Sequence, residues 1–259
     1  MANTNPVKVA MIGVGAISGI YLKNITNVFK EVELVGVCDL IPERAEKGVQ
    51  TVKEYIEAGA KAPVPKIYKD MYEAFNDPEV EVVLNLTRPY EHYGVTKAAL
   101  EHGKHVLCEK PMALTREACA HMIAAAEATG KKLMVGQVCR YAPAFAKAKE
   151  LIDAGEIGEL YYVESEYAHD YLKVRGANDW RVDPMRYGLL GGGCHAMDLL
   201  SWIAGRPNEV FAYSNHKMLK DWPTDDTTIA VLKYPGDVIG KVFCSISCNC
   251  LIQSEKYRF

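Results

Sequence analysis

The sequence predicts an α/β protein: a doubly wound parallel sheet of the Rossmann type, followed by a domain of the α+β type. Short apolar runs alternate with helix-like segments over the first 138 residues, which is the pattern of a parallel sheet with helices on both faces. The runs are continuously apolar, as expected for strands buried on both faces. Beyond Val138 the runs are longer and alternate partly, which is typical of an open, mostly antiparallel sheet with one exposed face.

The first part contains strands and helices in strict alternation. Pro42 suits the first turn of a helix, and Thr115 and Gly130 suit the two ends of another. The expected strands are Val7–Ile12, 32–39, 79–87, 104–109 and 132–137, and the expected helices run from the glycine turn at 13–19 to about Phe29 and over 42–59, 69–77, 89–103 and 115–130.

The second part contains fewer helices and longer strands. Helices are expected at 142–155 and 195–205, and strands at 159–171, 208–218, 227–234 and 238–250. This change in the pattern of strands and helices predicts a domain boundary near Val138. It gives a nucleotide-binding domain over residues 1–138 and a substrate or oligomerisation domain over 139–259. The sheet is expected to stop soon after 238–250, so that the second domain is shortened.

Composition excludes several classes of protein. Of the 259 residues 49% are hydrophobic and 24% charged, and the net charge is −3, so we expect no nucleic acid and no anionic membrane as partner. The first residues lack the apolar segment of a secretory signal, and no apolar run reaches the ~20 residues of a membrane span. Eight cysteines without paired spacing indicate reduced thiols and a cytoplasmic location.

The first glycine turn resembles the dinucleotide fingerprint G-x-G-x-x-G, with Ser18 where the third glycine belongs. Gly13 allows a sharp exit from the strand, and Gly15 lets the backbone approach a diphosphate closely. The helix that begins near Ala16 and Ile17 would offer N–H groups and a partial positive charge to that diphosphate.

An acidic residue ends the second strand. Asp39 lies where a carboxylate would accept hydrogen bonds from an adenosine ribose, and it would repel a 2′-phosphate, so NAD is favoured over NADP. Arg44, one helical turn later, keeps NADP possible. The alternative is a purely structural turn followed by a surface aspartate.

Three further stretches carry candidate site residues. Leu86 and Thr87 end the third predicted strand and His92 follows it, and Glu109 ends the fourth with Lys110 directly after it. Open α/β sheets bind ligands at these carboxyl ends. A lysine ammonium there could stabilise negative charge on a substrate oxygen. Alternatively, His92 caps a helix and Glu109–Lys110 forms a charged surface turn.

The second glycine-rich stretch, Gly191–Gly193, precedes His195 and Asp198 on one helix face. Histidine can serve as a base near neutral pH, with a carboxylate to orient it; alternatively, these residues cap the helix and complement its dipole. The segment 177–188 is expected to be a long loop that contacts substrate or crosses between domains.

Three cysteines near the end of the sequence have even spacing. Cys244, Cys248 and Cys250 are therefore expected on one face of a strand. Three thiols could suggest zinc, but no fourth ligand stands out, so a buried strand face is favoured and no metal is expected.

Taken together, the ordered motifs GVGAISG, VCD, NLTRPYEH, EKP and GGGCHAMDLL resemble the glucose–fructose oxidoreductase/inositol dehydrogenase/MocA (Gfo/Idh/MocA) family. The resemblance implies a Rossmann domain, a C-terminal α+β domain, and oxidation or reduction of a sugar or cyclitol hydroxyl with NAD or NADP. It implies Lys110 at the active site and His195 as the acid/base. The cofactor contacts it implies are Gly13, Gly15, Ala16, Ile17, Asp39, Leu86, Thr87, His92, Glu109 and Lys110.

Two departures from the family pattern stand out. Many family dehydrogenases carry an aspartate four residues before the histidine, where this chain has Gly191. Family members also commonly run past this chain's end, so an exposed sheet would need a partner subunit, which favours a homo-oligomer (a dimer or a tetramer) built through the C-terminal sheet.

The leading hypothesis is therefore an NAD-dependent dehydrogenase acting on a sugar, cyclitol or related polyol. One alternative uses bound NAD cyclically to eliminate a glycosidic bond without net oxidation. Another is a family member that binds nucleotide but catalyses nothing.

Overall fold

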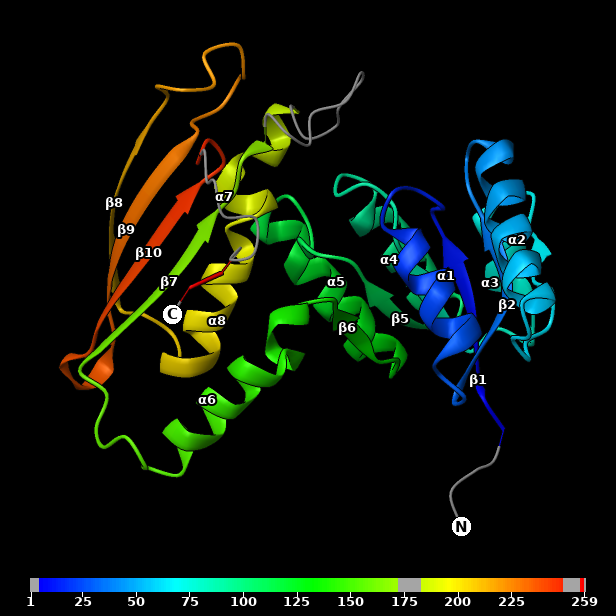
Figure 1. Cartoon of the computed structure of the whole chain (residues 1–259), viewed down its shortest axis with the longest axis horizontal. Helices are drawn as coiled ribbons and strands as arrows, with labels where there is room; N and C mark the ends of the chain where they lie inside the picture. The colour runs from blue at the N-terminus through cyan, green and yellow to red at the C-terminus, as the bar shows by residue number, and fades with distance from the viewer. Residues whose placement is uncertain (1–4, 172–182, 249–256, 259) are drawn as a thin grey trace. The chain divides into compact units, whose positions relative to one another are not determined.

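The computed structural model describes residues 5–171, 183–248 and 257–258, and the chain divides into two compact units, Met1–Gly136 and Gln137–Phe259. Each unit has its own sheet (Figure 1).

The first unit contains a six-stranded sheet in the order β3-β2-β1-β4-β5-β6, and every neighbouring pair is parallel. This order is that of the dinucleotide-binding fold, so the predicted doubly wound sheet is confirmed. The order reverses between β1 and β4, and the glycine turn follows β1 at that point. The strands are β1 Val7–Ile12, β2 Val32–Cys38, β3 Lys66–Ile67, β4 Val82–Asn85, β5 His105–Cys108 and β6 Leu133–Val135.

Five helices cover the two faces of this sheet. In β1, Val9 and Met11 pack with Leu22 of the first helix, whereas Ala10 and Ile12 belong to a separate core on the other face. This alternation within one apolar strand shows that both faces are buried. The helices are α1 Ser18–Asn27, α2 Pro42–Glu57, α3 Met71–Asn76, α4 His92–Glu101 and α5 Arg116–Thr129.

Helix ends in the first unit follow the expected capping chemistry. The Thr115 side chain accepts a hydrogen bond from the Ala118 N–H at the start of α5, and Gly130 ends α5 with a φ of 65°. Both ends were predicted from the sequence, because threonine supplies a capping oxygen and glycine tolerates the left-handed conformation.

The second unit contains a five-stranded mixed sheet in the order β11-β7-β10-β9-β8. Only β7 and β10 pair in parallel; the other neighbours are antiparallel, as predicted for a mostly antiparallel sheet. The strands are β7 Tyr162–Ala168, β8 Glu209–Asn215, β9 Thr227–Lys233, β10 Ile239–Ser245 and β11 Tyr257–Arg258. The helices are α6 Pro143–Asp153, α7 Gly188–Gly191 and α8 Cys194–Ala204, with single turns η1 Val138–Tyr141 and η4 Pro184–Arg186.

One face of this sheet packs against α8 and forms the core of the second unit, and no other described element covers the opposite face (Figure 1). On the uncovered face Phe211 pairs with Val231 and Tyr213 with Ile229, and all four are exposed, Phe211 by 61% and Tyr213 by 70%. We call Phe211, Tyr213, Ile229, Val231 and Ile239 the outer face of the sheet.

The structure corrects three predictions in the second unit. The sheet does not stop after 238–250, because β11 pairs with β7. Cys244 and Cys248 do not share a strand, since β10 ends at Ser245, and Cys250 lies outside the described residues. In the expected loop 177–188, Pro184–Arg186 forms a helical turn and α7 begins at Gly188, whereas 177–182 lie outside the described residues.

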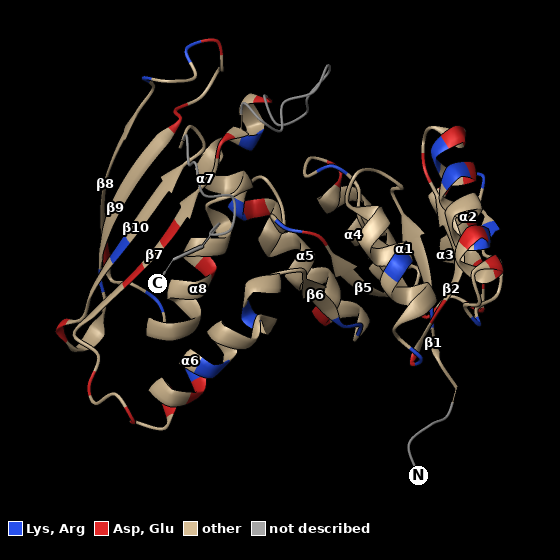
Figure 2. Cartoon of the chain, viewed as in Figure 1, with Lys and Arg blue, Asp and Glu red and all other residues tan. Residues whose placement is uncertain are grey.

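Acidic and basic residues both lie along α2 and α6 (Figure 2). On α6, Lys147 pairs with Glu150 and Lys149 with Asp153. Within the parts of the chain that the structure describes, no helix is both long enough and apolar enough to cross a lipid bilayer.

Candidate coenzyme and substrate site

The glycine turn begins with a residue that can only be glycine. Gly13 has a φ of 95°, and a Cβ there would lie 2.8 Å from the carbonyl carbon and oxygen of Leu86. Its N–H donates to the carbonyl of Cys38 at 2.8 Å. The ends of β1, β2 and β4 therefore meet at Gly13 with no room for a side chain.

The next part of the turn is open. Gly15, Ala16 and Ile17 are exposed at the start of α1, and a Cβ on Gly15 would meet nothing within 4 Å. This space, in front of the amino end of a ten-residue helix, fits the diphosphate of a dinucleotide. Ser18, in the place of the third fingerprint glycine, is buried, and its hydroxyl donates to the Gly15 carbonyl at 2.7 Å. The serine therefore stabilises the turn.

Asp39 braces the same turn. One carboxylate oxygen accepts the N–H of Val14 at 2.7 Å and the other accepts the N–H of Ile41 at 2.9 Å. Arg44 lies 3.9 Å from the second oxygen, and the Asp39 side chain is only 8% exposed. The sequence predicted a ribose contact for Asp39 but not this contact with the glycine turn.

A buried asparagine organises the end of β4, and the sequence analysis missed it. The Asn85 amide donates to the His92 carbonyl and the Thr96 hydroxyl, and its oxygen accepts the Thr87 hydroxyl at 2.6 Å. The signal for this residue was an amide side chain inside an otherwise apolar strand, because a buried amide needs several partners.

His92 is almost fully buried, with 1% exposure. Its Nδ1 lies 2.7 Å from the carbonyl oxygen of Pro111 and its Nε2 lies 3.1 Å from that of Thr87. Burial lowers the pKa of His92, and this effect outweighs the two carbonyls, which favour the charged ring. A neutral ring has a single N–H and can donate to only one of these carbonyls. The shorter contact, at Nδ1, joins the start of α4 to the turn that contains the cis Lys110–Pro111 bond.

Glu109 and Lys110 lie directly beyond β5. The Glu109 N–H donates to the Asn85 carbonyl at 2.9 Å, and the Glu109 carboxylate accepts the N–H of Lys110 at 3.0 Å and the hydroxyl of Tyr21 at 2.7 Å. The predicted coenzyme residues of the first unit thus gather at the carboxyl ends of β1, β2, β4 and β5.

His195 lies in the first turn of α8 and is 3% exposed. The ring of Tyr167 stacks on it, with centroids 6.4 Å apart and planes at 28°. Asp198 points to a different partner, since its two oxygens accept from Nε and Nη2 of Arg140 at 2.7 and 2.6 Å. The structure therefore shows an Asp198–Arg140 ion pair where a carboxylate orienting His195 was considered.

In the second glycine stretch, other residues of the protein occupy the space where side chains would lie. A Cβ on Gly191 would lie 2.4 Å from Cζ of the buried Arg186, whose Nη2 donates to the Gly191 carbonyl at 3.1 Å. A Cβ on Gly192 would lie 2.3 Å from the Tyr167 ring, and one on Gly193 would lie 2.8 Å from the Leu189 carbonyl oxygen. The aspartate that the resemblance expects at 191 would meet the Arg186 guanidinium.

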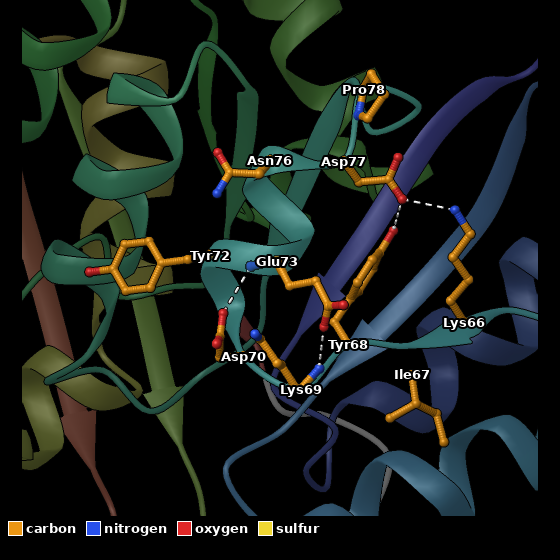
Figure 3. Close-up of a pocket in the computed structure, with 10 residues that line it drawn as sticks. All are labelled: Lys66, Ile67, Tyr68, Lys69, Asp70, Tyr72, Glu73, Asn76, Asp77 and Pro78. Carbon is orange, nitrogen blue, oxygen red and sulfur yellow. Dashed lines mark hydrogen bonds and ion pairs between the residues drawn. The ribbon is translucent and has the colours of Figure 1, made fainter.

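A surface depression of about 860 Å³ lies between β3 and α3 (Figure 3). Its polar side chains mainly bind one another: Asp77 accepts from Lys66 at 2.9 Å and from the Tyr68 hydroxyl at 2.8 Å. Burial alone would raise the pKa of Asp77, but these bonds and the Glu79 N–H lower it to about 2. The depression therefore presents ion pairs that are already formed.

Comparison with known proteins is consistent with this geometry. A family model described as "Oxidoreductase family, NAD-binding Rossmann fold" matches residues 7–137, and a "GFO/IDH/MocA C-terminal domain" model matches residues 145–252. A trans-1,2-dihydrobenzene-1,2-diol dehydrogenase from Mus musculus is 34% identical over 195 residues, which is 74% of this chain and 57% of that protein. An inositol 2-dehydrogenase/D-chiro-inositol 3-dehydrogenase from Lactiplantibacillus plantarum is 34% identical over 168 residues, 64% of this chain and 45% of that protein.

Solved structures share the fold. Myo-inositol 2-dehydrogenase from Lactobacillus plantarum superposes with a TM-score of 0.82 at 20% identity, covering 93% of this chain and 70% of that one. GenD2 from gentamicin A biosynthesis, in complex with NAD, gives 0.81 at 22% identity, covering 96% and 68%. The chain spans about half the length of the curated relatives it matches.

Proposed function

Because the chain belongs to the Gfo/Idh/MocA family of NAD-binding oxidoreductases, we propose that it is a dehydrogenase acting on a hydroxyl of a cyclitol, a sugar or a related polyol. The observation that carries the proposal is the open space at Gly15 in front of α1, beside the carboxylate of Asp39. The names of the curated relatives, which act on inositol and on a cyclic diol, support a cyclic substrate with adjacent hydroxyl groups.

The coenzyme-binding residues are proposed as follows. Gly13, Gly15, Ala16 and Ile17 hold the diphosphate at the helix amino end, and Asp39 holds the adenosine ribose. Leu86, Thr87, His92 and Glu109 shape the remaining wall, with His92 acting through its contacts with backbone carbonyls. NAD is the proposed coenzyme, and Arg44 beside Asp39 leaves NADP as the second choice. When bound, the nicotinamide supplies the hydride acceptor.

Two residues are proposed to act on the substrate. His195 accepts the hydroxyl proton at a ring nitrogen, since imidazole is a suitable base near neutral pH. Lys110 donates a hydrogen bond from its ammonium group to a substrate oxygen and stabilises developing negative charge on it. Both roles follow from the family resemblance at these positions.

The experiment that tests this function is an assay of NADH formation with NAD and a panel of myo-inositol, glucose and a cyclic vicinal diol. For Lys110→Met we expect turnover to fall by about 10²-fold or more while NAD affinity changes little. Lys97→Met is the matched control, since Lys97 pairs with Glu101 on the surface of α4. Equal turnover in Lys110→Met and wild type would remove lysine from the mechanism.

The same assay separates the alternatives. Steady accumulation of NADH identifies net oxidation. Cleavage of a glycoside without NADH accumulation identifies cyclic use of the coenzyme. Saturable NAD binding with no reaction of any substrate in the panel would favour a non-catalytic nucleotide-binding protein.

We also propose a homo-oligomer, a dimer or a tetramer, formed through the outer face of the second sheet. Large apolar side chains such as Phe211 and Tyr213 are exposed there, and burying such a patch stabilises association. Tyr213→Glu should lower the mass measured by sedimentation, whereas Tyr72→Glu, on α3, should not. A cytoplasmic location is proposed because the described cysteines are all free thiols.

A further inference from the structure

We infer that Tyr21 is a positioning residue for the turn that carries Glu109 and Lys110, and that it couples this turn to the glycine turn at the coenzyme diphosphate. The inference rests on the proposed function for its catalytic consequence. It rests on the first unit alone for its geometry.

Tyr21 extends from α1 to the end of a distant strand. In the sheet, β4 lies between β1, which precedes α1, and β5, which precedes Glu109. The Tyr21 hydroxyl nevertheless reaches the Glu109 carboxylate at 2.7 Å. This bond joins two segments 88 residues apart in the sequence, so it ties the position of α1 to that of the turn after β5.

The Glu109 carboxylate passes this restraint to Lys110. Its first oxygen accepts the Tyr21 hydroxyl, and its second accepts the Lys110 N–H at 3.0 Å. A carboxylate held at both oxygens cannot rotate freely, so the backbone of Lys110 is fixed relative to α1. Without the tyrosine hydroxyl, one oxygen loses its partner and the side chain gains rotational freedom.

The other end of the coupling lies at the glycine turn. Ser18, one helical turn before Tyr21 on α1, donates to the Gly15 carbonyl at 2.7 Å. One helix therefore contacts both the proposed diphosphate-binding backbone and the glutamate beside the proposed catalytic lysine. Burial raises the pKa of Tyr21, as does the Glu109 carboxylate, so the hydroxyl remains a donor at neutral pH.

Hydrogen exchange of the Lys110 amide tests the geometry, and it requires no substrate. Pro111 has no amide, and the first two residues of a peptide retain no label, so a peptide spanning 107–113 reports chiefly on this turn. In the full chain, Tyr21→Phe should accelerate exchange of this amide about fivefold, the effect of losing one hydrogen bond. Tyr72→Phe is the control, because Tyr72 is 48% exposed on α3 and should leave the peptide unchanged.

Glu109→Gln and the double variant sharpen the test. If Tyr21 acts through Glu109, the Lys110 amide should exchange no faster in the double variant Tyr21→Phe/Glu109→Gln than in Glu109→Gln alone. Both changes break the same hydrogen bond between Tyr21 and Glu109. The acceleration should be confined to this turn. Uniform acceleration that includes β1 and β4 would mean that Tyr21 only stabilises the fold, and this result, like an unchanged Lys110 amide, would overturn the inference.

Turnover supplies the readout that a purely structural role would not move. In the NADH assay we expect Tyr21→Phe to lower kcat about fivefold to tenfold while the KM for NAD changes less than about twofold. An unchanged kcat would overturn the inference. If the wild type oxidises no member of the panel, the proposed function fails, and the exchange data still decide whether Tyr21 positions the turn.

Discussion

The chain contains two glycine-rich turns that resemble each other in sequence and differ in structure. In the first, Gly15 faces open space, and a Cβ there would meet nothing within 4 Å. In the second, a Cβ added to each of the three glycines would lie 2.3 to 2.8 Å from Arg186, Tyr167 or the Leu189 carbonyl. The first turn leaves room for a ligand, whereas the second makes room for the protein's own side chains.

This difference explains the departure of the second turn from the family pattern. Gly191 has no room for a side chain because the buried guanidinium of Arg186 lies where that side chain would be. His195 follows this turn and stacks against Tyr167, the residue that also packs on Gly192. Tyr167 therefore packs against both the glycine stretch and His195.

The largest expected effect in this comparison is at Gly13. Gly13→Ala places a Cβ 2.8 Å from the Leu86 backbone at a φ of 95°, so unfolding free energy should fall by about 3 kcal/mol or more. Urea titration of the two proteins measures this loss. Gly94→Ala, where a Cβ meets nothing within 4 Å, is the control and should not be destabilised.

At the second turn the obstacle is a side chain, so the expected loss is smaller. Gly191→Ala should reduce the unfolding free energy by about 2 kcal/mol, because the Arg186 guanidinium must move. In urea titrations, Arg186→Ala should lower the unfolding free energy less in the Gly191→Ala protein than in the wild type. Simple additivity of the two losses would show that Arg186 is not what restricts position 191.

Acid should affect the two turns differently. His92 lies beside the first turn, where its ring nitrogens contact the Thr87 and Pro111 carbonyls and burial lowers its pKa. The second turn packs against the Arg186 guanidinium instead. The folded state disfavours protonated His92. The contribution of the neutral ring to the unfolding free energy is therefore fully present above about pH 6.5, the ordinary histidine pKa, and is lost as the pH falls below that value. Hydrogen exchange, corrected for the intrinsic pH effect, should show loosening around His92 before the Gly191 turn. Loosening of the Gly191 turn before the region around His92 would contradict the view that His92 is the acid-sensitive group.

The smallest expected effect is at Gly19, which lies in α1 with open space around it. Gly19→Ala should raise the unfolding free energy by about 0.5 to 1 kcal/mol, because alanine favours helix. Thermal unfolding measures the gain. A loss instead would mean that the start of α1 is more crowded than the structure shows.

Sequence reasoning located the first turn and most of the fold because those features depend on local patterns. The apolar run Val7–Ile12 was predicted with its observed limits, and its last four residues alternate between two buried cores. The edge strand β3 was missed because it has only two residues, both exposed, which leave no periodic signal.

Contacts between distant residues could not be predicted from the sequence. Arg140 and Asp198 are 58 residues apart, and no spacing rule relates them, so Asp198 was considered as a partner of His195. His92 was predicted to contact the coenzyme, but no pattern indicated that both its ring nitrogens face backbone carbonyls. The contacts of Arg186 and Tyr167 with the second glycine turn could not be predicted either, because they arise from tertiary packing.

Calorimetric titration with NAD tests the central claim most directly, since it asks whether the open turn holds the coenzyme. The wild type should bind one NAD per chain. Gly15→Ala should bind about tenfold more weakly or worse, with an unchanged melting temperature, because a methyl group would occupy the space of the diphosphate. Equal affinity in Gly15→Ala, or no saturable heat with the wild type, would contradict the account.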